Sequence, residues 1–148
     1  MKLISIIIPT HNRPEHLKKA VDSVFKQGWK DIEIIVIDDG EKTRAESTVE
    51  AFADSRIQYI KNKKNIGGGA SRNRGIRASH GDYIAFLDDD DEWVEGKLSE
   101  QIILLEKSGE KVGFCFGAAR IMGLGEEHIS TVPEGEGDYH ERALRRFS

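Results

Sequence analysis

The chain has 148 residues, with 22 Lys and Arg against 26 Asp and Glu, a formal net charge of −4. This length suits one domain with a hydrophobic core, and the slightly acidic balance argues against nucleic acid as a partner. No apolar run could span a bilayer and no signal-peptide pattern opens the chain, so we expect a cytoplasmic protein with no transmembrane segment in this chain. Cys115 is the single cysteine, which excludes an internal disulfide, and its apolar neighbours predict a packed, inert thiol.

Short apolar runs alternate with amphipathic stretches, the pattern of an α/β fold. Residues 3–8 and 32–37 are rich in Ile, as central parallel strands buried on both faces should be. Between them, apolar residues recur on one helical face, at Leu17, Ala20, Val21, Val24 and Phe25. We expect Asn12 to cap this helix, with Glu15 completing a capping box.

The later pattern predicts, in chain order, a helix over 43–53, a strand over 57–60, a helix over 70–78, a strand over 83–87, a helix from about Leu98 to Gly109 and a strand over 112–118. From Gly123 the apolar periodicity fades, and we expect an irregular segment followed by a terminal helix over 140–147.

Four consecutive aspartates, 88–91, follow the apolar run 83–87. Adjacent carboxylates repel one another, which raises the proton affinity of some of them unless a cation or a basic group offsets the charge. Oxygen ligands of this kind suit Mg²⁺ or Mn²⁺. Taken in isolation, such a run is more often a solvated turn that caps the next helix.

Polar segments follow each predicted strand, at 9–12, 38–40, 61–73 and 88–91. In an open parallel sheet, ligands bind outside the carboxyl ends of the strands. Acidic residues at two of these ends and basic residues at a third predict a pocket for an anionic, metal-bound ligand, and a nucleoside diphosphate fits that description.

Several of these residues also have structural roles to be weighed. The sequence Asp38-Asp39-Gly40 is a common turn, and Lys61, Lys63 and Lys64 are typical of a solvated surface. Of Arg72 and Arg74, we expect only one to reach a phosphate. Trp93 could stack on a sugar, although packing of the helix that it precedes is the more common role.

Four segments resemble the inverting family 2 glycosyltransferases with the GT-A fold, in that family's order and spacing: 5–13, 33–40, 65–75 and 81–91. The resemblance covers residues 3 to about 105 and implies a Rossmann-like, mostly parallel sheet flanked by helices. It implies a domain over 1–120 that binds a nucleotide-sugar donor. Residues 121–148 would then be an irregular tail or the start of the acceptor-side region, whose remainder is absent from this chain.

The resemblance also assigns roles to residues of the predicted pocket. Those implied to bind the nucleotide are Pro9, Thr10, His11, Asp39, Arg72 and Asp89. Asp88 and Asp90 would be the metal-binding pair of a DxD-type motif, with Mn²⁺ or Mg²⁺ as the cofactor. Of these residues, Arg72 would contact the base or the diphosphate and Asp89 the ribose.

The activity implied is transfer of a sugar, with inversion, from a nucleoside-diphosphate sugar to an acceptor hydroxyl. The resemblance favours a UDP-sugar as the donor and a saccharide or lipid-linked acceptor. It also favours a peripheral location at the inner face of the membrane. The family's catalytic base lies downstream of the DxD motif, and the late acids, Glu134, Glu136, Asp138 and Glu141, lack the expected context. We therefore expect the base to lie outside this chain, weak or absent transfer by the chain alone, and a dimer if apolar surface is exposed over 123–148.

Three alternatives remain open. The serious one is a non-catalytic module that binds a nucleotide sugar. A phosphoacceptor signalling domain would need Lys and Thr at later strand ends, which the region after Val112 does not clearly supply. A nucleotidyltransferase should have a glycine-rich, basic loop after the first strand, and residues 9–12 are not such a loop.

Overall fold

The computed structural model describes residues 2–42, 45–109, 112–117, 119–121 and 128–130. The chain divides into two compact units, residues 1–103 and 104–148. Among the described residues, no helix combines the length and the apolar character needed to cross a bilayer.

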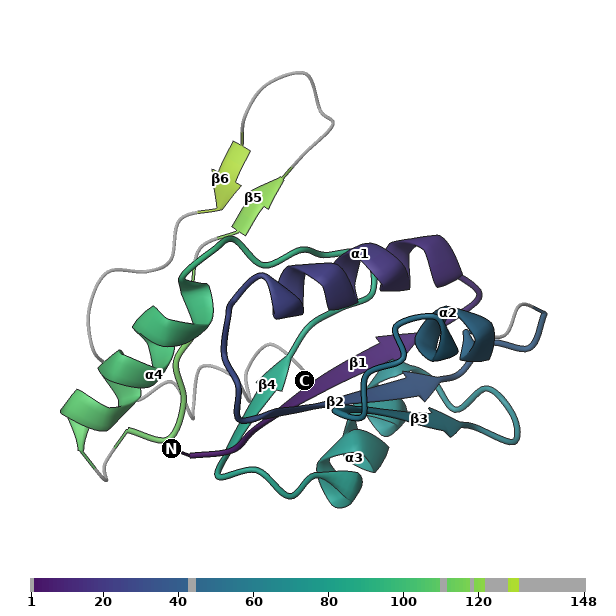
Figure 1. The fold of residues 1–148 in the computed structure, drawn as a ribbon, viewed down its shortest axis with the longest axis horizontal. Helices are drawn as coiled ribbons and strands as arrows, with labels where there is room; N and C mark the ends of the chain where they lie inside the picture. Colours follow the sequence, from purple (N-terminus) through teal and green to yellow (C-terminus); the bar gives the residue numbers. More distant parts are fainter. Residues whose placement is uncertain (1, 43–44, 110–111, 118, 122–127, 131–148) are drawn as a thin grey trace, which may run out of the picture. The chain divides into compact units, whose positions relative to one another are not determined.

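The first unit is built on a four-stranded parallel sheet with the spatial order β3-β2-β1-β4 (Figure 1). Its strands are β1 (Ile4–Thr10), β2 (Ile32–Asp38), β3 (Ile57–Lys61) and β4 (Tyr83–Phe86). The two Ile-rich strands are central, as the sequence predicts. The register pairs Thr10 with Asp38 and Asp38 with Lys61, so the carboxyl ends of three strands lie side by side.

The helices of the described residues are α1 (Pro14–Phe25), α2 (Glu46–Glu50), α3 (Gly68–Ala78) and α4 (Lys97–Ser108). Side chains of a strand alternate between the two faces of the sheet, so β1 contributes to two cores. Ile4, Ile6 and Ile8 belong to a large buried cluster that includes the apolar face of α1. Ile7 lies on the other face, in a smaller cluster with Ile35 and Ile37 against which Ala78 of α3 packs. The helices thus hold the sheet from both sides and leave its carboxyl edge for the connecting loops.

The start of α1 corrects the predicted capping box. Asn12 has φ 56°, in the left-handed region, whereas an N-cap residue has extended backbone. Arg13 occupies the N-cap position without a side-chain cap hydrogen bond, and Pro14 opens the helix. Proline suits this position because its missing N–H would be unpaired there in any case. The Asn12 side chain instead accepts a hydrogen bond of 3.0 Å from the backbone N–H of Lys42.

The second predicted helix is also shorter in the structure. The sequence predicts helix over 43–53, but α2 covers only Glu46–Glu50, and residues 43–44 lie outside the described residues. Ala53 has φ 48°, a left-handed conformation that a continuing helix excludes. The helix predicted over 70–78 is present and begins two residues earlier, at Gly68.

The predicted strand over 112–118 is wrong for its described part, residues 112–117, which form no strand. Apolar composition alone does not make a strand, because a strand also needs a neighbour that supplies ladder hydrogen bonds. Phe114 is 56% exposed, and Cys115, predicted to be packed, is half-buried. The second unit instead contains an antiparallel pair, β5 (Ala119–Ile121) and β6 (His128–Ser130), so the segment predicted to be irregular includes a strand. The predicted terminal helix lies outside the described residues.

Candidate nucleotide-sugar site

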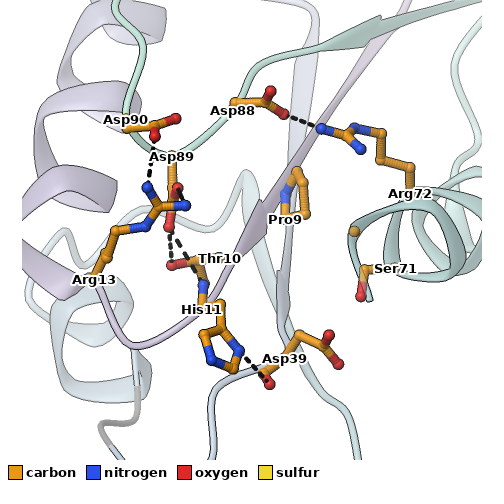
Figure 2. Close-up of a pocket in the computed structure, with 11 residues that line it drawn as sticks. Pro9, Thr10, His11, Arg13, Asp39, Ser71, Arg72, Asp88, Asp89 and Asp90 are labelled. Atoms are coloured by element: carbon orange, nitrogen blue, oxygen red, sulfur yellow. Dashed lines mark hydrogen bonds and ion pairs between the residues drawn. The ribbon is translucent and has the colours of Figure 1, made fainter. Parts of the chain in front are cut away.

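A pocket of about 280 Å³ opens at the carboxyl edge of the sheet (Figure 2). It is lined by Pro9, Thr10, His11, Arg13, Asp39, Gly68, Ser71, Arg72, Asp88, Asp89 and Asp90. Every residue that the resemblance assigns to the nucleotide or the metal is among them, so the structure brings the predicted set together. Their roles toward a ligand stay predictions.

Asp89 is the fixed point of the acidic run. It is 2% exposed, and its Oδ2 accepts a hydrogen bond of 2.7 Å from Thr10 Oγ1 and one of 3.3 Å from the His11 backbone N–H. Its Oδ1 lies 3.0 Å from the guanidinium of Arg13. Two hydrogen-bond donors and the Arg13 cation therefore hold this buried carboxylate in place. The loop after β4 is thereby fixed to the loop after β1.

Asp88 and Asp90 project to either side of Asp89, and each is paired with an arginine (Figure 2). Arg72, on α3, donates to Asp88, and Arg13 donates to Asp90 over 2.5 Å. The two carboxylates are 47% and 49% exposed. Basic groups therefore offset the charge of the run, one of the two means that the sequence suggests for such a cluster.

Asp91 shows the repulsion that remains. Burial, followed by the charges of Asp90, Asp88 and Asp89, raises the pKa of the Asp91 carboxyl above its ordinary value. Asp91 does not line the pocket, and it has no arginine partner among the described ion pairs. It is thus the member of the run whose charge is least offset.

Asp39 organises the opposite wall of the pocket. Its carboxylate is 5% exposed and accepts hydrogen bonds from Asn62 Nδ2 at 2.8 Å and from the backbone N–H groups of Ile66 and Gly67 at 2.9 and 2.8 Å. Gly67 has φ 81°, which glycine adopts without strain. These bonds fix the loop from which α3 begins, and α3 carries Arg72.

His11 lies between the two walls. Its Nδ1 is 2.9 Å from the backbone carbonyl oxygen of Asp39. A carbonyl can only accept, so this contact places the proton on Nδ1. The imidazole ring is therefore oriented by the loop after β2 although it belongs to the loop after β1.

Asp38 has a structural role, unlike its neighbour Asp39. It is fully buried and accepts hydrogen bonds from the N–H groups of Gly40 and Ala45, from the Tyr59 hydroxyl and from Lys61. Burial raises the pKa of the Asp38 carboxyl, but these donors outweigh it and leave the pKa below its ordinary value. The network also corrects one expectation, because Lys61 is not merely solvated, whereas Lys63 and Lys64 are exposed.

The remaining predicted residues divide as follows. Arg74 donates to the Lys61 carbonyl at 2.9 Å and to the Asn62 side chain, so of Arg72 and Arg74 only Arg72 lines the pocket. Trp93 is 8% exposed and packs in the core rather than in the pocket. The sequence reasoning missed Arg13, Gly68 and Ser71 as lining residues. Arg13 carried a usable signal, because it is a base that directly follows the first polar segment.

Asp88 and Asp90 are the residues of the pocket that could hold a divalent metal. Among the described residues, no three His, Cys, Asp or Glu side chains are grouped so as to hold an ion by themselves. Asp88 and Asp90 are half-exposed oxygen donors on one pocket wall, and Mg²⁺ or Mn²⁺ commonly binds to one or two carboxylates together with phosphate and water. The residues therefore fit a metal that arrives with a diphosphate.

Residues 5–146 match the model of the family described as Glycosyl transferase family 2. The chain belongs to this family. It is 40% identical over 116 residues to the Escherichia coli protein UDP-Glc:alpha-D-GlcNAc-diphosphoundecaprenol beta-1,3-glucosyltransferase WfaP, a match that covers 78% of this chain and 45% of that protein. The chain thus spans less than half the length of this relative.

Two solved structures share the fold of this chain. Staphylococcus aureus TarS 1-349 in complex with UDP-GlcNAc superposes with a TM-score of 0.66 at 23% identity, over 71% of this chain and 31% of that one. The mannosyltransferase PcManGT from Pyrobaculum calidifontis, in complex with GDP-Man and Mn²⁺, gives 0.63 at 18% identity, over 68% and 31%. These likenesses confirm the α/β GT-A fold class that the sequence predicts.

Proposed function

We propose that this chain binds a nucleoside-diphosphate sugar, with UDP as the preferred nucleotide, and serves its metal-dependent, inverting transfer to an acceptor hydroxyl. The observation that carries the proposal is the convergence of Asp39, Arg72 and the acidic run in one pocket of a family 2 chain. The choice of UDP is supported by a relative whose name gives a UDP-Glc donor and by a structure of the same fold with UDP-GlcNAc.

The nucleoside would be held by residues of the first two loops. Two oxygens of a carboxylate offer about four acceptor positions. Asp39 and Asp89 each have three donors, and the Ile66 N–H is shared between the two oxygens of Asp39, so each carboxylate can accept from one further donor. Asp39 would accept from the base N–H and Asp89 from a ribose hydroxyl, while Pro9 and the ring of His11 would pack against the nucleoside.

The diphosphate would lie between Arg72 and the exposed acids. Arg72 is 36% exposed, and its guanidinium presents several N–H donors that suit phosphate oxygens. Asp88 and Asp90 are the residues that would hold Mn²⁺ or Mg²⁺, and a bound ion would offset the charge of the departing diphosphate. Without such an ion, two carboxylates would face an anionic ligand and oppose its binding.

Transfer also needs a base for the acceptor hydroxyl. We find no candidate for it among the residues that line the pocket beyond those already assigned, and the late acids lie outside the described residues. A lipid-linked acceptor at the membrane surface is supported by the diphosphoundecaprenol in the name of the relative. The competing function is a module that binds the nucleotide sugar without transfer, which needs only the pocket residues already described.

The test is calorimetry of the purified chain with UDP, GDP and UMP, each with and without Mn²⁺. We expect UDP to bind, and Mn²⁺ to strengthen that binding about tenfold or more, which is 1.4 kcal/mol. UMP lacks the second phosphate and is the matched control, for which Mn²⁺ should change little. Failure of every nucleoside diphosphate to bind with metal would contradict the proposal.

A second measurement separates the enzyme from the binding module. Donor hydrolysis and transfer to a diphosphate-linked lipid are followed at saturating UDP-sugar. Binding without either reaction would support the module, whereas robust transfer by the chain alone would show that one of the late acids serves as base.

A further inference from the structure

Arg13 is the charged lining residue to which neither the resemblance nor the comparisons assign a role. It comes from the loop after β1 and reaches the acidic run 77 residues away in the chain. One guanidinium nitrogen lies 3.0 Å from Asp89 Oδ1, and the other lies 2.5 Å from Asp90 Oδ2. A single side chain thus bridges two consecutive aspartates.

The two partners of Arg13 differ in their exposure to solvent, and therefore in their access to a ligand. Asp89 is 2% exposed and has Thr10 and the His11 N–H as further donors, so a cation could replace Arg13 at Asp89 only by disrupting this buried network. Asp90 is 49% exposed, and Arg13 supplies its described ion pair. A metal ion in the pocket could therefore take Asp90 from Arg13 while the contact with Asp89 stays.

We propose that Arg13 is a positioning residue that competes with a metal ion for Asp90. It holds Asp89 in place, and it releases Asp90, but not Asp89, when a metal–diphosphate binds. The inference rests on the proposed function, because it takes the pocket to be a metal and diphosphate site. A metal ion that binds Asp90 would therefore have to displace Arg13, because the charge of this carboxylate is already offset by the guanidinium.

The geometry of the run supports this exchange. Asp89 lies between Asp88 and Asp90 in the chain, so a fixed Asp89 determines where both neighbours project (Figure 2). Arg72 holds Asp88 on the other side in the same manner. Because exposed ion pairs contribute little net free energy, the exchange of such a pair for a metal–carboxylate bond costs little.

The test measures Mn²⁺ affinity as the Mn²⁺ concentration that gives half of the maximal strengthening of UDP binding in calorimetry. Arg13→Gln frees Asp90, so we expect about two- to fivefold tighter binding than in the wild type, the size of one exposed ion pair. The gain should shrink in 1 M salt, where the competing pair is screened. Arg56→Gln is the matched control, because it removes the same charge from an ion pair, with Asp54, outside the pocket. It should leave Mn²⁺ affinity unchanged.

A double-mutant cycle with Asp90→Asn shows whether the effect runs through Asp90. We expect Arg13→Gln to strengthen Mn²⁺ binding in the wild-type background and to restore none of the binding that is lost in the Asp90→Asn background. A merely structural role of Arg13 would give the reverse sign, with weaker Mn²⁺ binding by Arg13→Gln than by the wild type. If Arg13→Gln does not fold, Arg13→Lys replaces it. Lysine keeps the charge but cannot bridge two carboxylates with one planar group, so Arg13→Lys should bind Mn²⁺ more tightly than the wild type.

The outcomes distinguish this inference from the proposed function. Equal Mn²⁺ affinity of the wild type, Arg13→Gln and Arg56→Gln, together with metal-dependent UDP binding by all three, overturns the role of Arg13 alone. Absence of metal-dependent UDP binding in every variant overturns the proposed function.

Discussion

Thr10 donates a hydrogen bond of 2.7 Å to Asp89, and this buried contact joins the carboxyl ends of β1 and β4 across 79 residues of chain. The strand register explains why the two residues meet. Ile7 pairs with Phe86; Thr10 lies three residues further along β1, and Asp89 lies three residues past the end of β4. The alignment of the strands therefore places a hydroxyl donor opposite the buried carboxylate of the acidic run.

Thr10→Val should destabilise the fold by about 1.5 to 3 kcal/mol, because it removes a neutral donor from a buried charged acceptor. Urea unfolding at pH 7 measures the change. Thr48→Val, on α2 and outside the pocket, makes the same substitution and should change stability by less than about 0.5 kcal/mol. Equal effects of the two substitutions would show that the Thr10 hydroxyl contributes nothing specific.

Asp38→Asn should cost about 2 to 4 kcal/mol at pH 7, because an amide cannot accept from donors on both sides as the buried carboxylate does. The folded pKa of Asp38 lies below its ordinary value of 3.8, so its stabilising contribution is present above pH 3.8 and is lost as the pH falls through the lowered pKa. The difference between wild type and variant should therefore narrow below pH 3.8 in urea titrations.

Asp54→Asn is the matched control for this substitution. A hydrogen bond from Arg56 lowers the pKa of the Asp54 carboxyl to about 2. The pair lies near the surface, where ion pairs contribute at most about 1 kcal/mol, so the variant should lose far less stability than Asp38→Asn. Similar losses would mean that the buried network around Asp38 does not govern the loop after β2.

The sheet and the membership of the pocket were predictable for a simple physical reason. Ile-rich runs are typical of parallel strands buried on both faces, and the carboxyl ends of such strands share one edge. Polar residues that follow different strands must then converge, wherever they lie in the chain. The shared edge alone therefore places Pro9, Asp39 and Asp89 near one another, whatever their contacts.

The pairing of side chains within the pocket could not be predicted in the same way. Asp38 and Asp39 are neighbours in a common turn sequence, yet one is enclosed by Tyr59 and Lys61 while the other lines the pocket. The difference depends on which way the chain turns after β2. Arg13 likewise acquires its role only through tertiary packing. The strand predicted over 112–118 failed because its apolar pattern says nothing about whether a pairing neighbour exists.

Gly75→Ala should destabilise the protein by about 1 to 3 kcal/mol, because α3 packs closely on β1 at this position. A Cβ at Gly75 would lie 2.4 Å from Cγ2 of Ile7, which is fully buried and cannot move away easily. Thermal or urea unfolding measures the loss. Gly69→Ala, in the same helix, meets no atom within 4 Å and should raise stability by about 0.5 to 1 kcal/mol through helix propensity. If both variants were stabilised, the contact of α3 with the sheet would be looser than the structure shows.

Asp90→Ala should abolish the Mn²⁺-dependent part of UDP binding, because it removes an exposed donor of the pocket. Without metal it should change the free energy of unfolding by less than about 1 kcal/mol, the value of an exposed ion pair. Asp91→Ala removes the neighbouring acid and is the matched control, and it should keep Mn²⁺-dependent UDP binding.

The pKa of Asp91 is raised in the folded protein, so its ionised form opposes folding as the pH rises above 3.8. Asp91→Ala should therefore be slightly more stable than the wild type at pH 7 and lose this advantage below pH 3.8. Calorimetry with UDP and Mn²⁺, combined with melting curves without metal, checks both variants. A fall of several degrees in the melting temperature of Asp90→Ala, with Mn²⁺-dependent binding retained, would assign Asp90 a structural role instead.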